Sequence, residues 1–158
     1  MIDTLFRFCC GVIEVVAVLS GYTYKEVGSI SFVYLQPALL SFTAALPMLL
    51  MIVKLWKHRT PHRFAITAMS VVWFLPFAFG TLKLWQRYSG TLEEACDALC
   101  ADMHWLGETT GLGYETTNIL LFIVAFLFFF LLNIFLYTLV RNTMLDAPRT
   151  KRRKKLKK

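Results

Sequence analysis

Two stretches of this chain, ninety positions apart, follow one pattern. Residues 20–33 read SGYTYKEVGSISFV, and residues 110–123 read TGLGYETTNILLFI. At this offset the alignment pairs two glycines and two tyrosines, Gly21 with Gly111 and Tyr24 with Tyr114, and a long apolar run follows each copy. We interpret the pattern as a weak parallel internal repeat in which an S/T-G-x-x-Y turn leads into a membrane helix twice. The repeat predicts an architecture and names no reaction.

The apolar residues are concentrated in long runs. Of the 158 residues, 57% are hydrophobic and 17% are charged, a balance unlike that of an ordinary soluble domain. Residues 29–53, 64–82 and 119–140 contain no charged side chain. Each run has about 20 residues or more, which is enough for a helix to cross a hydrocarbon core of roughly 30 Å. The sequence therefore predicts an all-α integral membrane protein.

The charges between these runs predict an orientation. The segment 54–63 holds four basic residues and no acid, whereas 86–117 holds six acids and only Arg87. Short loops rich in Lys and Arg stay on the cytoplasmic side. We therefore expect segment 54–63 and the basic C-terminus on the cytoplasmic side and segment 86–117 on the outer side. We expect the N-terminus on the outer side as well, and we expect the membrane to be a bacterial inner membrane.

Seven segments follow from these patterns. We expect three transmembrane helices plus two interfacial amphipathic helices on the outer face. The segments are an outer interfacial helix and turn (1–28), a transmembrane helix (29–53), a cytoplasmic basic loop (54–63), a transmembrane helix (64–85), an outer acidic segment with an amphipathic helix (86–117), a transmembrane helix (118–140) and a cytoplasmic polybasic tail (141–158). Four crossings are the alternative, since residues 5–19 are apolar apart from Arg7 and Glu14.

The helix ends and the few polar residues within the crossings carry local predictions. Gly21 and Gly111 are each expected to end an interfacial helix in the left-handed conformation that glycine adopts cheaply. Thr23 and Glu26 have the spacing of a capping box, which the second copy lacks because Gly113 and Thr116 stand there. Within the crossings, two amide side chains are expected to bond between helices, Gln36 and Asn133.

The four cysteines are the main candidates for chemistry. Cys96, Cys100 and His104 recur at i, i+4 and i+8, so one helix face carries three groups that bind soft metals, although the spacing matches no familiar zinc motif. A disulfide is the second interpretation, because Cys9 and Cys10 fall on the other outer helix and Cys10 aligns with Cys100. Bonding within either pair is disfavoured by geometry. The third interpretation is four small apolar side chains packed at an interface.

The C-terminal run is strongly basic. It includes Arg152, Arg153, Lys154 and Lys155 and contains no acid after Asp146. Contact with anionic lipid headgroups is the simplest interpretation. Binding to nucleic-acid phosphates is an alternative with little support, since no aromatic residue is interleaved for base stacking. The run can also serve only to fix topology.

No arrangement of residues in the sequence assembles a base, a nucleophile and an oxyanion donor. We therefore expect no enzymatic activity and no cofactor. The leading hypothesis is a non-catalytic subunit or scaffold of a larger membrane complex, with other membrane subunits or further copies of itself as partners. A small oligomeric channel or transporter is the alternative. A redox or metal-handling protein that uses the outer cysteines is the third.

Overall fold

The computed structural model describes residues 2–57 and 61–145, and these form helices and turns without a strand. The helices are α1 (Ile2–Ser20), α2 (Tyr24–Ser29), α3 (Gln36–Lys57), α4 (Pro61–Arg87), α5 (Leu92–Thr110), α6 (Tyr114–Ile119) and α7 (Phe126–Leu145). Two π-helical segments, η1 (Ile30–Leu35) and η2 (Leu120–Ala125), join α2 to α3 and α6 to α7. The expected all-α class is confirmed.

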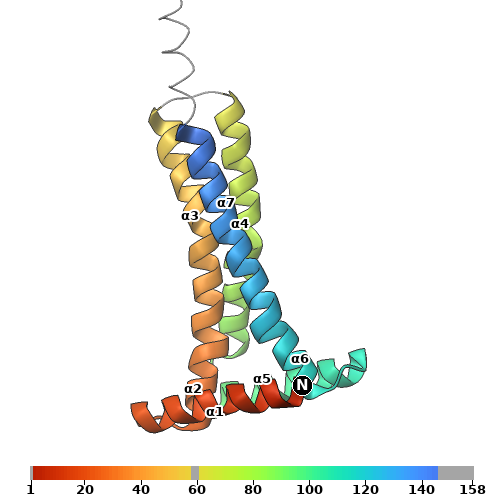
Figure 1. Ribbon diagram of the computed structural model, residues 1–158. Helices are drawn as coiled ribbons and strands as arrows, with labels where there is room; N and C mark the ends of the chain where they lie inside the picture. Colours follow the sequence, from red (N-terminus) through yellow and green to blue (C-terminus); the bar gives the residue numbers. More distant parts are fainter. Residues whose placement is uncertain (1, 58–60, 146–158) are drawn as a thin grey trace, which may run out of the picture.

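Within the described residues, three continuous helices are long and apolar enough to cross a membrane. They cover Tyr24–Trp56, Pro61–Arg87 and Tyr114–Asn142, with mean hydropathies of 2.0, 1.7 and 3.1. The helix α1 is not among them, and in Figure 1 it lies across the end of the bundle formed by the three long helices. This arrangement matches the three-crossing prediction rather than the four-crossing alternative.

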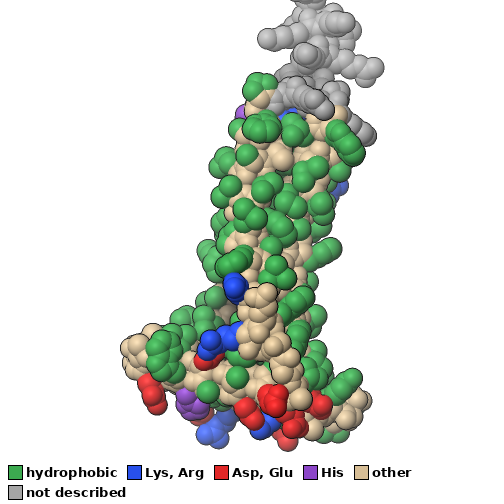
Figure 2. All heavy atoms as spheres, turned by 180° about the vertical axis from the view of Figure 1, so that it is seen from behind, with side chains coloured by type: hydrophobic (Ala, Val, Ile, Leu, Met, Phe, Trp, Pro, Cys, Tyr) green, Lys and Arg blue, Asp and Glu red, His purple; other side chains and the backbone are tan. Residues whose placement is uncertain are grey.

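The helices α1 and α5 lie at the same end of the bundle and run in opposite directions; we call them the platform helices (Figure 1). Hydrophobic side chains cover the bundle, and acidic side chains gather at the platform (Figure 2). The bundle helices extend further than their uncharged runs, because α3 continues to Lys57 and α4 begins at Pro61. Most of the expected loop 54–63 is therefore helical. Residues 58–60 and 146–158, which include most of the basic tail, lie outside the described residues.

The predicted helix ends are confirmed. Gly21 and Gly111 have φ angles of 76° and 71° where α1 and α5 end. The capping box of α2 is formed, since the Glu26 amide donates to Thr23 Oγ1 (3.2 Å) and the Thr23 amide donates to the Glu26 carboxylate (2.7 Å). Gly113 makes no side-chain cap for α6, as expected. A second capping box, Thr91 with Glu94, starts α5 and was not foreseen.

The π-helical segments were also not foreseen, and both contain a carbonyl that bonds to a side chain of another helix. Pro37 has no N–H, so the Val33 carbonyl lacks its usual i+4 donor and instead accepts the indole N–H of Trp85 (3.0 Å). The Phe122 carbonyl accepts the Gln36 side-chain amide (3.1 Å), which confirms the interhelical role expected of Gln36. Side-chain donors thus bond to backbone carbonyls at the places where the regular α-helical hydrogen bonding is broken.

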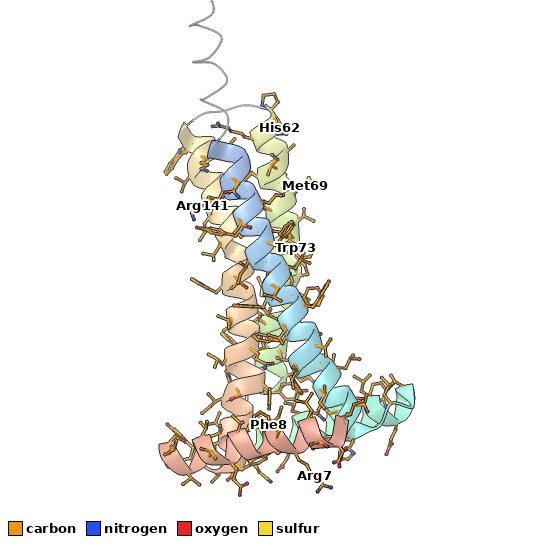
Figure 3. All side chains as sticks on the ribbon, in the orientation of Figure 1. Arg7, Phe8, His62, Met69, Trp73 and Arg141 are labelled. Atoms are coloured by element: carbon orange, nitrogen blue, oxygen red, sulfur yellow. The ribbon has the colours of Figure 1, made fainter. Side chains whose placement is uncertain are left out.

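Asn133 holds the centre of the bundle together. Its side chain is fully buried, and its Nδ2 donates to Thr43 Oγ1 (3.1 Å) and to the Leu40 carbonyl (3.3 Å), both on α3. Its Oδ1 accepts the indole N–H of Trp73 on α4 (2.9 Å). Figure 3 shows Trp73 among the side chains of the bundle. One amide on α7 therefore connects all three long helices, and the interhelical role expected of Asn133 is confirmed.

Each platform helix packs against a helix from the other half of the chain. The helix α1 contacts α6, which leads into α7, and α5 contacts α2, which leads into α3. The buried Ser29 hydroxyl of α2 donates to the Leu92 carbonyl at the start of α5. Each platform helix thus spans from its own half of the chain to the other half.

The substitution Asn133→Leu should destabilise the protein by about 1–3 kcal/mol, since hydrogen bonds between membrane helices contribute about 0.6 kcal/mol each, up to about 1.7, and the Trp73 N–H would lose its acceptor. Reversible unfolding in mixed micelles would measure this change. Thr138→Val is the matched control, because Thr138 is exposed and bonds only within α7. Equal stability of the two variants would contradict the central role of Asn133.

Gly107→Ala should disrupt the corner between α5 and α6. A Cβ on Gly107 would lie 2.7 Å from the backbone carbon of Gly113 and 2.9 Å from the Tyr114 nitrogen, so the backbone would have to move. We expect a loss of about 1–3 kcal/mol, as for other overpacked sites. Gly11→Ala is the control, since a Cβ there meets no atom within 4 Å. Thermal unfolding in detergent should separate the two, and a fully stable Gly107→Ala protein would show that this corner is not tight.

Candidate functional site

A cavity of about 410 Å³ lies where the platform helices meet the first turns of the two repeat-related long helices. Both halves of the chain line it, and all four cysteines and both motif tyrosines belong to its wall: Cys9, Cys10, Tyr24, Cys96, Cys100 and Tyr114. We call it the platform cavity. Most of its remaining wall is apolar. Residues that the sequence placed on two separate helices therefore share one site.

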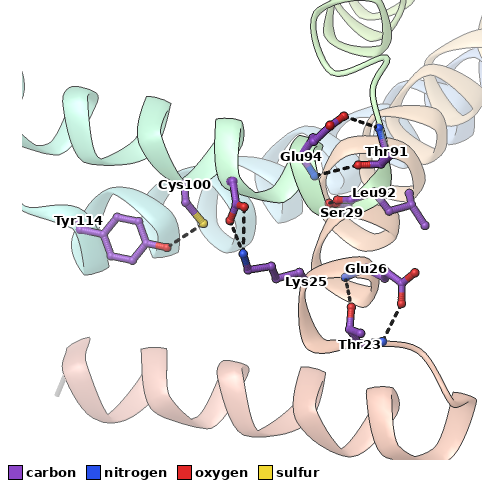
Figure 4. Close-up of polar contacts among 10 residues, drawn as sticks. Thr23, Lys25, Glu26, Ser29, Thr91, Leu92, Glu94, Cys100 and Tyr114 are labelled. Carbon is purple, nitrogen blue, oxygen red and sulfur yellow. Dashed lines mark hydrogen bonds and ion pairs between the residues drawn. The ribbon is translucent and has the colours of Figure 1, made fainter.

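Thiol and phenol groups form two pairs in this wall. The Tyr114 hydroxyl donates to Cys100 Sγ at 3.5 Å (Figure 4). The Tyr24 hydroxyl lies near the Cys10 thiol and interacts with it electrostatically. These pairs stand at equivalent positions of the ninety-residue alignment, so each half of the chain contributes one thiol and one phenol to the cavity.

Cys96 and Cys100 differ in the ease with which they ionise. The pKa of the Cys100 thiol is lowered to about 6, chiefly because the Cys96 thiol donates a hydrogen bond to its thiolate; burial opposes this change, and the Tyr114 hydroxyl donates a further bond. The pKa of Cys96 is raised, because it is the donor to the Cys100 thiolate and because it is buried. Cys100 is therefore the more readily ionised thiol of this pair, and the thiolate is the reactive form.

The metal-ligand candidates do not gather around one point. His104 stacks on the Tyr114 ring, with the ring centroids 4.1 Å apart and the planes at 15°. Across residues 2–57 and 61–145, no group of three or more His, Cys, Asp or Glu side chains is placed to hold a metal ion. The stripe Cys96, Cys100 and His104 lies on α5 as the spacing indicated, and its imidazole packs against an aromatic ring.

The disulfide prediction stays a prediction. All four cysteines are free thiols in the structure. They nevertheless line one cavity, from the two platform helices that the repeat aligned. The thiols of Cys96 and Cys10 also lie near enough to the tyrosines of both halves to interact with them electrostatically. The packing interpretation and the redox interpretation of the cysteines therefore concern the same place in the fold.

Aromatic rings form much of the cavity wall. Phe32 and Phe122 occupy equivalent alignment positions and pack against each other with ring centroids 4.5 Å apart. Phe6 of α1 meets the Tyr114 ring edge-on at 5.8 Å. At Gly28, a Cβ would lie 3.8 Å from Cys96 Sγ, in ordinary contact. The two phenylalanines were part of the repeat alignment, which made them equivalent but did not indicate that their rings touch.

Two ion pairs brace the platform at its edge. Lys25 Nζ lies 2.7 Å from the Asp97 carboxylate, and Arg87 Nη2 lies 2.7 Å from the Asp102 carboxylate. The Arg87 guanidinium and the Tyr88 hydroxyl both donate to Asp102 and hold the pKa of that carboxyl below its ordinary value. Both pairs are partly exposed, so each contributes little to stability and mainly fixes geometry.

The remaining predicted site residues fall into two groups. Gly21 and Gly111 end the platform helices and position the tyrosines that follow them. The basic residues Arg152, Arg153, Lys154 and Lys155 lie outside the described residues.

Together these features define, over the residues that the structure describes, an all-helical protein with three candidate membrane-spanning helices and a cavity lined by both platform helices. The chain matches no family model, no curated protein and no solved structure.

Cys100 should react with iodoacetamide in a pH-dependent way that follows its low pKa of about 6. The rate should rise through about pH 6 and level off near pH 7, because the thiolate is the reacting form. Tyr114→Phe removes one hydrogen bond to the thiolate and should move this midpoint to higher pH. Mass spectrometry of the alkylated peptide would give the rate at each pH.

Tyr22→Phe is the matched control for that measurement, since Tyr22 is exposed and lies outside the cavity wall. It should leave the midpoint unchanged. A Cys100 midpoint near 8.5 in the unmodified protein, the ordinary value of a cysteine, would contradict the thiol arrangement described above.

Proposed function

We propose that this chain is a non-catalytic multi-pass membrane protein that acts as a subunit or scaffold of a larger membrane complex. The basic segment 54–63 and the acidic segment 86–117 support an orientation with the platform outside a bacterial inner membrane and the C-terminus in the cytoplasm. In this orientation the basic tail would meet anionic lipid headgroups of the inner leaflet.

The exposed apolar stripe of α1 carries the proposal. Phe8, Val12, Val15 and Leu19 follow one another at helical spacing, and all four are exposed. Leu19 is 82% exposed, although large apolar side chains in a water-facing position are costly. The opposite side of the helix carries Asp3, Arg7 and Glu14. An exposed apolar stripe of this kind marks a contact with lipid or with another protein.

The placement of α1 favours a protein contact in addition to lipid. Because α1 lies across the bundle, its C-terminal end reaches beyond the side of the bundle, where the transmembrane helix of a neighbour could stand (Figure 1). A helix that serves only to anchor a protein has no need to be held by contacts to both halves of the chain, yet α1 contacts α2 and α6. We infer that these contacts hold α1 rigid so that its exposed apolar stripe can bind a neighbouring protein.

An internal duplication explains how this platform is built. The bounds of α1 and α5, of α2 and α6, and of η1 and η2 each differ by ninety residues, the offset of the sequence alignment. In this proposal α4 is the return helix between two copies of a platform-turn-span unit. The two copies diverged in their platform helices, since α5 is more acidic and less apolar than α1.

Site-specific photo-crosslinking would test the proposal. A photoreactive residue at Leu19 or Val15 should form a discrete protein adduct in native membranes, and mild detergent extraction should give a particle larger than one chain. Leu131 is the matched control, because it is equally apolar and exposed but lies on the side of the bundle; it should label lipid. A monomeric extract with only lipid adducts at Leu19 and Val15 would overturn the proposal, and solute flux in liposomes holding this chain alone would favour the channel alternative.

A further inference from the structure

The platform cavity has the dimensions of a small-molecule site. Its volume of about 410 Å³ lies within the roughly 300–1,000 Å³ that ligand pockets span. It is partly open, its wall is mostly apolar, and a few polar side chains interrupt it. Such a mixture of apolar wall and a few polar groups is what a ligand of low polarity with a small number of hydrogen-bonding atoms requires.

The aromatic side chains of the wall favour a flat ring. Phe6, Phe32, Phe122 and the two motif tyrosines line the cavity, and aromatic rings pack best against another ring in offset or edge-on geometry. A flexible acyl chain would fill the same space without making use of this geometry.

The two tyrosine hydroxyls favour a ligand with two acceptor atoms. Tyr24 and Tyr114 each come from one half of the chain, and each interacts with a thiol. Sulfur is a weak acceptor, and the Tyr114 contact is long at 3.5 Å. A carbonyl oxygen that entered the cavity would be the better partner for either hydroxyl. Both tyrosines line the cavity and lie near enough to interact electrostatically, so one ring that carries two oxygen acceptors can receive a hydrogen bond from each hydroxyl.

The location of the cavity limits the source of such a ligand. Its wall includes Phe122 and Ile123 of η2, at the beginning of a long apolar helix, and Phe8 and Val12 from the exposed stripe of α1. An apolar molecule dissolved in a bilayer around the bundle would meet these residues first. We propose that the platform cavity binds the ring of a lipid-soluble quinone, with the hydroxyls of Tyr24 and Tyr114 donating to its two carbonyl oxygens. This proposal requires the bundle to lie in a membrane and does not depend on the subunit role.

Equilibrium binding of a short-tailed benzoquinone to the full chain in detergent would test the inference. All ring positions of the probe should be substituted, so that thiolates cannot add to the ring. We expect saturable binding of one probe per chain and slower alkylation of Cys100 in its presence. Tyr24→Phe with Tyr114→Phe should weaken binding about 5- to 150-fold, since each of the two hydrogen bonds contributes about 0.5–1.5 kcal/mol. Tyr22→Phe, whose side chain is outside the wall, should bind as the parent does.

Two further measurements keep the outcome decisive. An alkylbenzene with the same tail and no carbonyl should bind more weakly, and Ser31→Trp, which fills the cavity, should abolish binding while Ser70→Trp should not. Thermal unfolding would confirm that each variant is folded. Equal affinity for the quinone and the alkylbenzene would overturn the proposal in favour of a cavity for lipid chains. Unchanged affinity in the double tyrosine variant or in Ser31→Trp would also overturn it.

Discussion

The amide of Asn133 is the interaction on which the arrangement of the long helices depends. In a low-dielectric interior, a primary amide without partners is costly, and water is not available to replace them. The side chain finds acceptors on α3 and a donor on α4, and these bonds favour the observed relative rotation and height of the three helices. Apolar side chains around it would tolerate several rotations. The amide stabilises one of these rotations, and the position of the platform at the end of the bundle depends on that rotation.

The platform depends on this choice because its two helices are shared between the halves of the chain. The contacts of α1 with α6 and of α5 with α2 join elements whose positions are set by α7 and α3. The cavity is the space left where these four helices meet, so its wall takes residues from four separate parts of the sequence. Its shape is therefore a property of the packing of the bundle, and a change at Asn133 could reach it without touching it.

Much of the fold could be predicted from local pattern. Apolar runs without charge indicated the three long helices, and glycine and the Thr23 capping box indicated where helices end and begin, because these signals act over a few residues. Asn133 and Gln36 could be assigned to helix–helix bonds because a bilayer leaves an amide few other choices. The amphipathic pattern of 92–106 indicated a helix at an interface or a protein surface rather than a further crossing.

The rest could not be predicted because it depends on contacts between distant residues. The bond from Trp85 to the Val33 carbonyl requires a proline on one helix and an indole on another to meet. The low pKa of Cys100 depends on Tyr114 beyond the next turn and on the rotamers of two thiols. The cavity was invisible in the sequence, although the aligned cysteines, tyrosines and phenylalanines of its wall were all present in the repeat. Alignment of two copies shows which residues are equivalent, but not that they face one another.

The π-helical segments set the rotational phase of each long helix relative to its first turns. One residue advances an α-helix by about 100° around its axis, because a turn has 3.6 residues. Each π-helical segment widens a turn by about one residue and so rotates everything after it by a comparable angle. If the same residues Leu120–Ala125 wound as a regular α-helix, Asn133 would turn away from α3 and α4 by about a quarter of a circle. These two irregular turns therefore act as a rotational offset between the cavity and the bundle, and the offset is the same in both halves of the chain.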